Sequence, residues 1–160
     1  MPRYPKPQPG DYFDVPLVPD DCSEEAVPPA FGQVLSLEPS AMNSVACAFW
    51  PERAGDVESL LSQKPIAVQL VTPDLLRDQQ WPIRGNGACS VPMQYRRYEQ
   101  FRAAEWVGAK VVGSGIIREL LLAFRGLALW DDFADPTYLD RLLLPGVSPP
   151  PCARYKRARS

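Results

Sequence analysis

Three segments within the first fifty residues alternate between apolar and polar positions, which is the pattern of strands that bury one face. DYFDVPLV (residues 11–18) alternates in this way, and Pro16 places this strand at the edge of a sheet. FGQVLSLE (31–38) and NSVACAFW (43–50) alternate again on either side of a short turn around Pro39. The sequence therefore predicts three antiparallel strands, forming a small curved sheet or an SH3-like open barrel in the N-terminal half.

The next segment mixes short helical patterns with one apolar strand. Residues 55–63 predict a short helix, and the β-branched run 65–72 predicts a central strand. Thr72 is a suitable N-cap for a helix over residues 73–80. Gly85-Asn86-Gly87 then predicts a turn in which glycines adopt positive φ angles.

A strand and a helix meet at a glycine-rich corner in WVGAKVVGSGIIRELLLAF (106–124). Residues 107–112 predict a strand, and Ser114 is a suitable N-cap for the helix that follows. Apolar residues recur along one face of this helix up to Gly126, the expected position of a glycine that ends it. The sequence predicts a strand-helix unit that packs on the sheet.

The triplet Gly113-Ser114-Gly115 completes none of three catalytic or phosphate-binding motifs. A P-loop needs lysine after the second glycine, but Lys110 precedes it. A dinucleotide fingerprint needs a small residue where Arg118 stands, and a nucleophile elbow needs glycines where Val112 and Ile116 stand. The free N–H groups of a helix start leave one functional alternative, an anion site at Lys110, Ser114 and Gly115.

The segment WDDFADPTYLDRLLLPG (130–146) predicts a C-terminal helix that Asp135 caps and Pro145-Gly146 ends. Asp131 and Asp132 lie close to Asp135, and carboxylates this close can hold Mg²⁺ or Ca²⁺. They do not follow the spacing of a calcium loop, so helix capping and exposure to solvent explain these carboxylates better. The sequence predicts no metal site and no cofactor.

The chain contains no histidine, which removes the Ser-His-Asp and Cys-His nucleophile systems and the commonest general base near neutral pH. The four cysteines are widely spaced and form no CxxC pair, so we expect free thiols. No apolar run reaches the roughly 18 residues that a membrane span needs, and no signal segment is recognisable at the N-terminus. We expect a cytoplasmic, non-enzymatic protein that does not enter a membrane.

Charge and proline are distributed unevenly along the 160 residues. All 19 acidic residues lie between Asp11 and Asp140, whereas six of the 17 basic residues lie near the two ends. The sequence predicts a flexible Pro-rich arm (1–10), a single acidic α+β domain (11–146), and a Pro-rich and then basic tail (147–160). An acidic body repels nucleic acid and suits a basic partner, and an equally good explanation is that the surplus acids only keep the surface soluble.

Five stretches, taken in order, resemble the immunity protein 26 family of bacterial polymorphic toxin systems. They are GDYFDVPL, FGQVLSLE, WPIRGN, WVGAKVVGSGII and LALWDDFADPTYLDRLLL, and the resemblance covers about residues 10–146. It implies an α+β protein that binds and neutralises a cognate toxin without catalysis. The sequence departs from the family in a long acidic, Pro-bounded loop over residues 19–29, where a tighter hairpin is expected.

The partner that this resemblance implies is a toxin domain, and the acidic body favours a basic one. No nucleic acid and no membrane are expected as partners. The candidate toxin-binding residues are the acids of the long loop and of the C-terminal segment, together with one tryptophan: Asp20, Asp21, Glu24, Glu25, Asp131, Asp132, Asp135 and Trp81. The alternative is a small cytosolic domain that binds an anion or a nucleotide at the helix start around Ser114.

Overall fold

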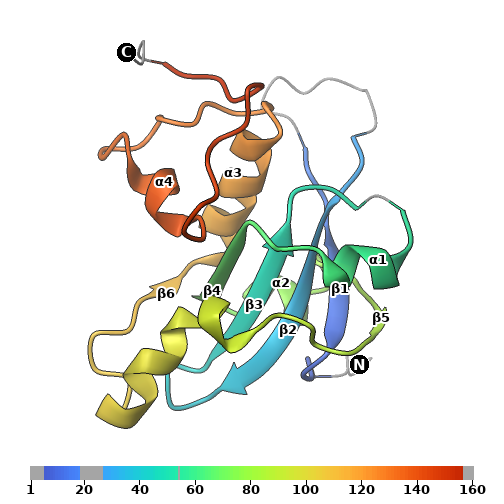
Figure 1. Cartoon of the computed structure of the whole chain (residues 1–160), viewed down its shortest axis with the longest axis vertical. Helices are drawn as coiled ribbons and strands as arrows, with labels where there is room; N and C mark the ends of the chain where they lie inside the picture. Colours follow the sequence, from blue (N-terminus) through green and yellow to red (C-terminus); the bar gives the residue numbers. More distant parts are fainter. Residues whose placement is uncertain (1–5, 19–26, 54, 157–160) are drawn as a thin grey trace.

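A computed structural model describes residues 6–18, 27–53 and 55–156 of the chain. Three strands come first, and helices are then interspersed with the remaining strands (Figure 1). The elements in chain order are β1 (Asp11–Val15), β2 (Ala30–Glu38), β3 (Ser44–Trp50), α1 (Val57–Ser62), β4 (Ala67–Val71), α2 (Asp74–Arg77), β5 (Ile83–Asn86), the 3-10 helices η1 (Met93–Tyr95) and η2 (Arg97–Ala104), β6 (Val111–Val112), α3 (Ser114–Phe124) and α4 (Tyr138–Leu142).

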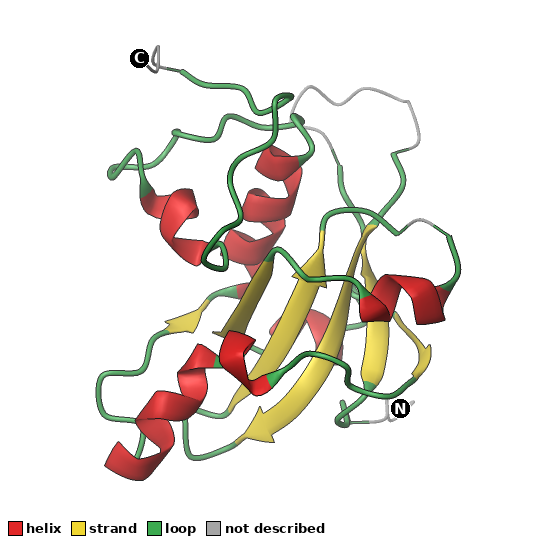
Figure 2. Cartoon of the chain, viewed as in Figure 1, coloured by secondary structure: helices red, strands yellow, loops and turns green. Residues whose placement is uncertain are grey.

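The strands form one open six-stranded sheet in the order β5-β1-β2-β3-β4-β6, labelled in Figure 1 and drawn in yellow in Figure 2. All neighbouring strands are antiparallel except β4 and β6, which pair in parallel through Leu70↔Val111 and Val71↔Val112. The predicted α+β class and the three consecutive antiparallel strands at the start are confirmed. Of the two predicted arrangements, the fold has the curved sheet.

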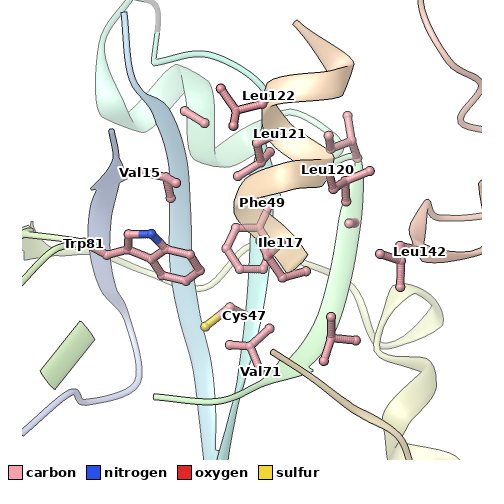
Figure 3. Packing of buried hydrophobic residues seen from close by; sticks show 14 of the residues in the cluster. Val15, Cys47, Phe49, Val71, Trp81, Ile117, Leu120, Leu121, Leu122 and Leu142 are labelled. Carbon is pink, nitrogen blue, oxygen red and sulfur yellow. The ribbon is translucent and has the colours of Figure 1, made fainter. Parts of the chain in front are cut away.

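The sheet is the middle layer of the molecule, with apolar residues on both faces. In β3, Val45, Cys47 and Phe49 belong to the core beneath α3, while the alternate residues belong to a second core beneath α1 and η2. Every residue of β3 is therefore buried, which explains why this strand is more apolar than the one-sided pattern requires. Figure 3 shows the first core, where Ile117 of α3 lies beside Phe49.

Three aromatic rings hold β1, β3 and the segment after α2 together. Phe13 stacks on Trp81 with ring centroids 5.5 Å apart, and Phe49 meets Trp81 edge-on at 5.8 Å. The ring of Phe13 also lies across Gly32 of the neighbouring strand, leaving no room there for a Cβ atom. Aromatic pairs of this kind contribute about 0.5–1.5 kcal/mol beyond the area they bury.

Two predictions about strands are wrong. Pro16 does not mark an edge, because it lies after the end of β1, and β1 pairs with β2 on one side and β5 on the other. The predicted strand over residues 107–112 is only the two residues of β6. The chain before β6 turns instead, because Trp106 and Gly108 have φ angles of 69° and 89°, which extended backbone cannot adopt.

The predicted Gly85-Asn86-Gly87 turn is also wrong. None of the three residues has a positive φ angle, and Gly85 and Asn86 belong to β5. Gly85 is needed for a different reason: the ring of Tyr12, its partner in β1, lies where a Cβ atom would stand. The glycine serves a cross-strand packing contact.

The helices follow the predictions more closely. α1 lies within the predicted range, and Asp56 caps it by accepting a hydrogen bond from Ser59 N at 3.1 Å. α3 ends as predicted, with Gly126 just after it at φ 76°. The helix over 73–80 is shorter than predicted, because α2 has only four residues and Thr72 does not cap it.

The segments predicted as arms are bonded to the domain where the structure describes them. Gly10 N donates to Val34 O at 2.8 Å, so the chain is attached to the sheet before β1 begins. At the other end, Trp130 N donates to Arg154 O at 2.8 Å, and Tyr155 packs against the first core. The folded unit therefore continues beyond the predicted boundary at residue 146, as far as residue 156.

Candidate functional site

The connection between β1 and β2 is the most unusual loop of the sheet. The last residue of β1, Val15, pairs with the first residue of β2, Ala30, so residues 16–29 connect two strand ends that lie side by side. Hairpin loops usually have two to five residues, and much longer ones are usually functional. The predicted contact residues of this loop, Asp20, Asp21, Glu24 and Glu25, lie outside the residues that the structure describes.

The base of this connection is fixed by an ion-pair cluster around Asp14. The Asp14 carboxylate, only 6% exposed, accepts from Arg53 Nη1 at 3.0 Å on both oxygens and from Arg84 Nε at 2.9 Å. Arg53 also donates its backbone N–H to Pro29 O at 2.9 Å. Charged hydrogen bonds to one buried carboxylate thus join the ends of β1, β3 and β5 beside the connection.

Arg125 secures the returning end of the same connection. Its Nη1 atom, at the end of α3, donates to Pro28 O at 2.9 Å and to Pro51 O at 3.1 Å. The guanidinium thereby joins α3, the start of β2 and the end of β3. Arg53, Arg84 and Arg125, which lie outside the connection, thus hold its two ends against the sheet and α3.

The three C-terminal acids have three different environments. Asp131 is buried and accepts from Lys156 N at 2.6 Å, so its predicted role as a surface contact is wrong. Asp132 is exposed, 3.5 Å from Lys156 Nζ. Asp135 accepts from the backbone N–H and hydroxyl of Thr137, and these bonds lower the pKa of its carboxyl. Among the described residues no group of three or more potential ligands has the geometry to hold a metal ion.

Trp81 was predicted to contact a partner, and that prediction is wrong. Its ring is 1% exposed, in the aromatic cluster with Phe13 and Phe49. Trp50, a further tryptophan on β3, is equally buried and donates from Nε1 to Gln63 O at 3.1 Å. Trp81 follows a short predicted helix, and nothing in the neighbouring sequence indicates whether a tryptophan there is buried or exposed.

The start of α3 is already bonded to the protein's own side chains. Ser114 is the first residue of the helix and not its cap, and its N–H donates to Thr72 Oγ1 at 2.9 Å. Its hydroxyl donates to Asp74 Oδ1 at 2.8 Å. Burial alone raises the pKa of Asp74, but the hydrogen bonds from Thr72 and Ser114, together with those from the backbone N–H groups of Asp74 and Leu75, outweigh burial and hold that pKa below its ordinary value. A carboxylate thus occupies the place predicted for an external anion, beside the exposed Gly115.

Lys110 lies elsewhere, in a cleft between η2, α4 and the edge of the sheet. Two lobes of this cleft, of ≈ 240 and ≈ 430 Å³, share the lining residues Gln69, Lys110, Arg141 and Leu142. Arg97 of η2 lines the first lobe and Tyr138 of α4 the second. One feature of the sequence could have indicated this cleft: Gln69 is the single polar residue inside the apolar run of β4.

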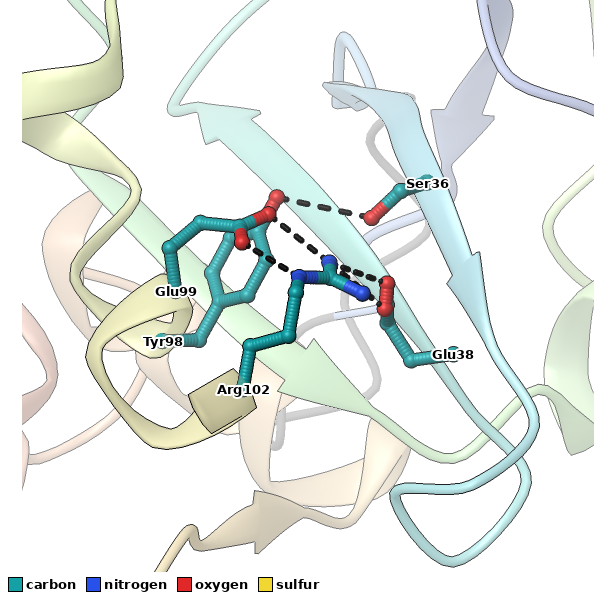
Figure 4. A network of polar contacts seen from close by, with 5 residues as sticks. All are labelled: Ser36, Glu38, Tyr98, Glu99 and Arg102. Carbon is teal, nitrogen blue, oxygen red and sulfur yellow. Dashed lines mark hydrogen bonds and ion pairs between the residues drawn. The ribbon is translucent and has the colours of Figure 1, made fainter. Parts of the chain in front are cut away.

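One wall of the cleft, η2, is attached to β2 through a buried carboxylate (Figure 4). Arg102 Nη2 donates to the two oxygens of Glu38 at 2.6 and 2.9 Å and to Glu99 at 2.9 Å. The hydrogen bond from Arg102 lowers the pKa of Glu99, and the bonds to Glu99 and Glu38 raise the pKa of the guanidinium. The Tyr98 and Ser36 hydroxyls, 3.4 Å apart, form a second link between η2 and β2.

Comparisons of the chain with protein-family models, with curated proteins and with solved structures found no match. The resemblance to the immunity protein 26 family therefore stays a prediction from the sequence. Within the described residues, no helix combines the length and the apolar character that crossing a bilayer requires.

Proposed function

We propose that this protein is a cytoplasmic immunity protein that binds a cognate secreted bacterial toxin and occludes its active site, without catalysis of its own. The observation that carries the proposal is the acidic connection 16–29, which leaves a closed strand pair at Val15↔Ala30. Loops held on a rigid scaffold are where binding residues concentrate. The resemblance of the sequence to immunity proteins supports the same function.

The charge of the connection suggests how recognition begins. Asp20, Asp21, Glu24 and Glu25 fall within one short stretch that contains no basic residue. Many toxins that act on nucleic acids or nucleotides have basic clefts, and an acidic stretch attracts such a cleft over long distances, which accelerates association. A stable complex needs roughly 800 Å² buried on each partner, so the rigid base around Asp14 and Arg125 belongs to the expected interface as well.

Lack of catalysis is part of the proposal. The chain has no histidine, and the Ser114 hydroxyl donates to the carboxylate of Asp74, whose lowered pKa makes it a weak base at neutral pH. We do not extend the alternative of an anion site at the start of α3, because the carboxylate of Asp74 stands there.

The test is a binding experiment with the product of the adjacent gene, made catalytically inactive. Reversing Asp20, Asp21 and Glu24 to lysine should slow association at least about tenfold and weaken its dependence on salt, since screening acts on the approach of charges. The matched control reverses three exposed acids elsewhere, Glu58, Asp78 and Glu105, which changes the net charge equally. Equal association rates for the two triple variants would show that the connection does not direct binding.

A further inference from the structure

The cleft at the edge of the sheet has an apolar floor and a basic rim. Leu142, Leu143 and Leu144 form the floor together with Val68 and Leu70, and each of these five is less than 10% exposed. Three cationic residues from different elements line the cleft above this floor: Arg97, Lys110 and Arg141. No acidic residue lines either lobe in the described part of the chain. Pockets for small organic ligands have this composition of apolar walls and a few convergent polar groups.

The cations of the rim differ in how they are held. Among the residues that the structure describes, neither Lys110 nor Arg97 has an acidic partner within salt-bridge distance. Arg141 pairs with Asp135 at 2.6 Å and lies over the ring of Tyr138, 5.8 Å from its centroid. One cation is therefore oriented in advance, and two positive charges beside an apolar floor lack a counter-charge.

The floor is fixed before any ligand arrives. Gln69 Nε2 donates to Leu142 O at 3.0 Å, Leu144 N donates to Ile66 O at 2.8 Å, and Lys64 Nζ donates to Pro145 O at 3.0 Å. These bonds attach the end of α4 and the segment after it to β4 and the residues before it. A preformed site loses little freedom when a ligand binds.

We propose that this cleft binds a small organic anion, with a carboxylate or phosphate group at Lys110 and Arg141 and an apolar or aromatic body on the leucine floor. Arg97 lies at the opposite lobe and favours a ligand whose negative charge extends along the cleft. This function is independent of toxin binding, because the acidic connection and its base contribute no residue to the lining.

The test is a titration of the isotope-labelled full chain followed by NMR. Phenyl phosphate and phenylacetate should shift the amide signals of Gln69, Lys110 and Leu142, with dissociation constants on the order of 1 mM, as expected for ligands of this size. Benzyl alcohol, which keeps the ring and lacks the charge, should bind at least about tenfold more weakly, and inorganic phosphate should also bind more weakly. Phenyl phosphate and phenylacetate together separate a preference for phosphate from one for carboxylate.

Two variants and a control locate the effect. Lys110→Met should weaken phenyl phosphate binding about tenfold, whereas Lys156→Met, which removes the same charge outside the cleft, should change it less than twofold. Asp135→Asn should strengthen binding about twofold to threefold, because Arg141 loses its competing carboxylate while the asparagine oxygen can still accept from Thr137.

Three results would overturn the proposal. The first is the absence of shifts at these amides for both aromatic anions up to about 10 mM. The second is binding of benzyl alcohol as tight as that of the two aromatic anions, which would show that the cleft recognises only the apolar ring. The third is an equal loss in Lys110→Met and Lys156→Met, which would reduce the effect to net charge.

Discussion

Arginine and lysine residues have opposite roles at two ends of the sheet. At the base of the β1–β2 connection, Arg53 and Arg84 both donate to the buried carboxylate of Asp14, and Arg125 donates to two backbone carbonyls. In the cleft beyond β4, Lys110 and Arg97 have no acidic partner among the described residues. The first set of cations holds the fold together, and the second set is available to a ligand.

The difference shows that the residue type of a cation does not tell whether it stabilises the fold or can bind a ligand. A guanidinium that satisfies a buried carboxylate cannot be removed without leaving a charge in a poorly solvated place, so it contributes to stability. An exposed cation without a partner contributes almost nothing to stability, and an anion can approach it without displacing an internal ion pair. This comparison leads to four predictions about stability.

The largest effect is expected for Asp14→Asn. Asparagine keeps one acceptor oxygen but carries no charge, so Arg53 and Arg84 both lose their ionic partner. The free energy of unfolding should therefore fall by about 3 kcal/mol. We place the effect at the low end of the range for buried pairs because Arg53 and Arg84 are 36% and 51% exposed. Chemical denaturation measures it, with Asp132→Asn as an exposed acidic control. A loss below about 0.5 kcal/mol would mean that the cluster does not hold the base.

Next comes Arg102→Met, which leaves the buried Glu38 without its cation and should cost about 2 kcal/mol. Hydrogen exchange should accelerate in η2 more than in α3, because the ion pair attaches η2 to β2. Adding Glu38→Gln should recover part of the lost stability, since the uncompensated charge is then removed. Additive losses in the double variant would show that the two side chains are not coupled.

A smaller effect is expected at the start of α3, where Thr72→Val removes the acceptor for Ser114 N and should cost about 1 kcal/mol. Asp74→Asn should destabilise the protein at neutral pH. The pKa of Asp74 is lowered in the folded protein, so its contribution is complete above the pKa of the unfolded chain and disappears as the pH falls through the folded value. Stability curves of the parent and Asp74→Asn should therefore converge at acid pH, and a constant difference across pH would contradict this explanation.

The smallest effects are expected in the cleft. Lys110→Met and Arg97→Met should each change the free energy of unfolding by less than about 0.5 kcal/mol, because neither cation has an internal partner to lose. Thermal and chemical denaturation of both variants test this directly. A loss of unfolding free energy as large as that of Asp14→Asn would show that these cations stabilise the fold, and the two regions would then not differ.

Local patterns in the sequence predicted most of the elements correctly. The alternation over residues 31–38 and 43–50 gave β2 and β3, and the apolar stripe ending at Gly126 gave α3. These features depend on side-chain periods and on the backbone freedom of one glycine, which act within a few residues. The α+β class follows from the order of such elements, and so it could be predicted without the structure.

The sites could not be predicted in this way, because they depend on contacts between residues far apart in the chain. Asp131 and Trp81 looked like surface residues, but folding places Asp131 against the backbone of Lys156 and Trp81 against Phe13. Ser114 looked like a cap facing an open helix start, but Asp74 approaches it from another helix. Lys110 was assigned to that helix start, and the turn before β6 carries it to the cleft instead.

The sequence by itself therefore determined most of the elements, the class of fold and the acidic character of the β1–β2 connection, because composition and short-range periodicity are properties of the chain. Only the tertiary structure decided which charges are paired and which are free. Glu38 meets Arg102, and Asp14 meets Arg84, across 64 and 70 positions of sequence. The sheet order that brings such residues together is set by the burial of apolar faces, on which the charged residues themselves have little influence.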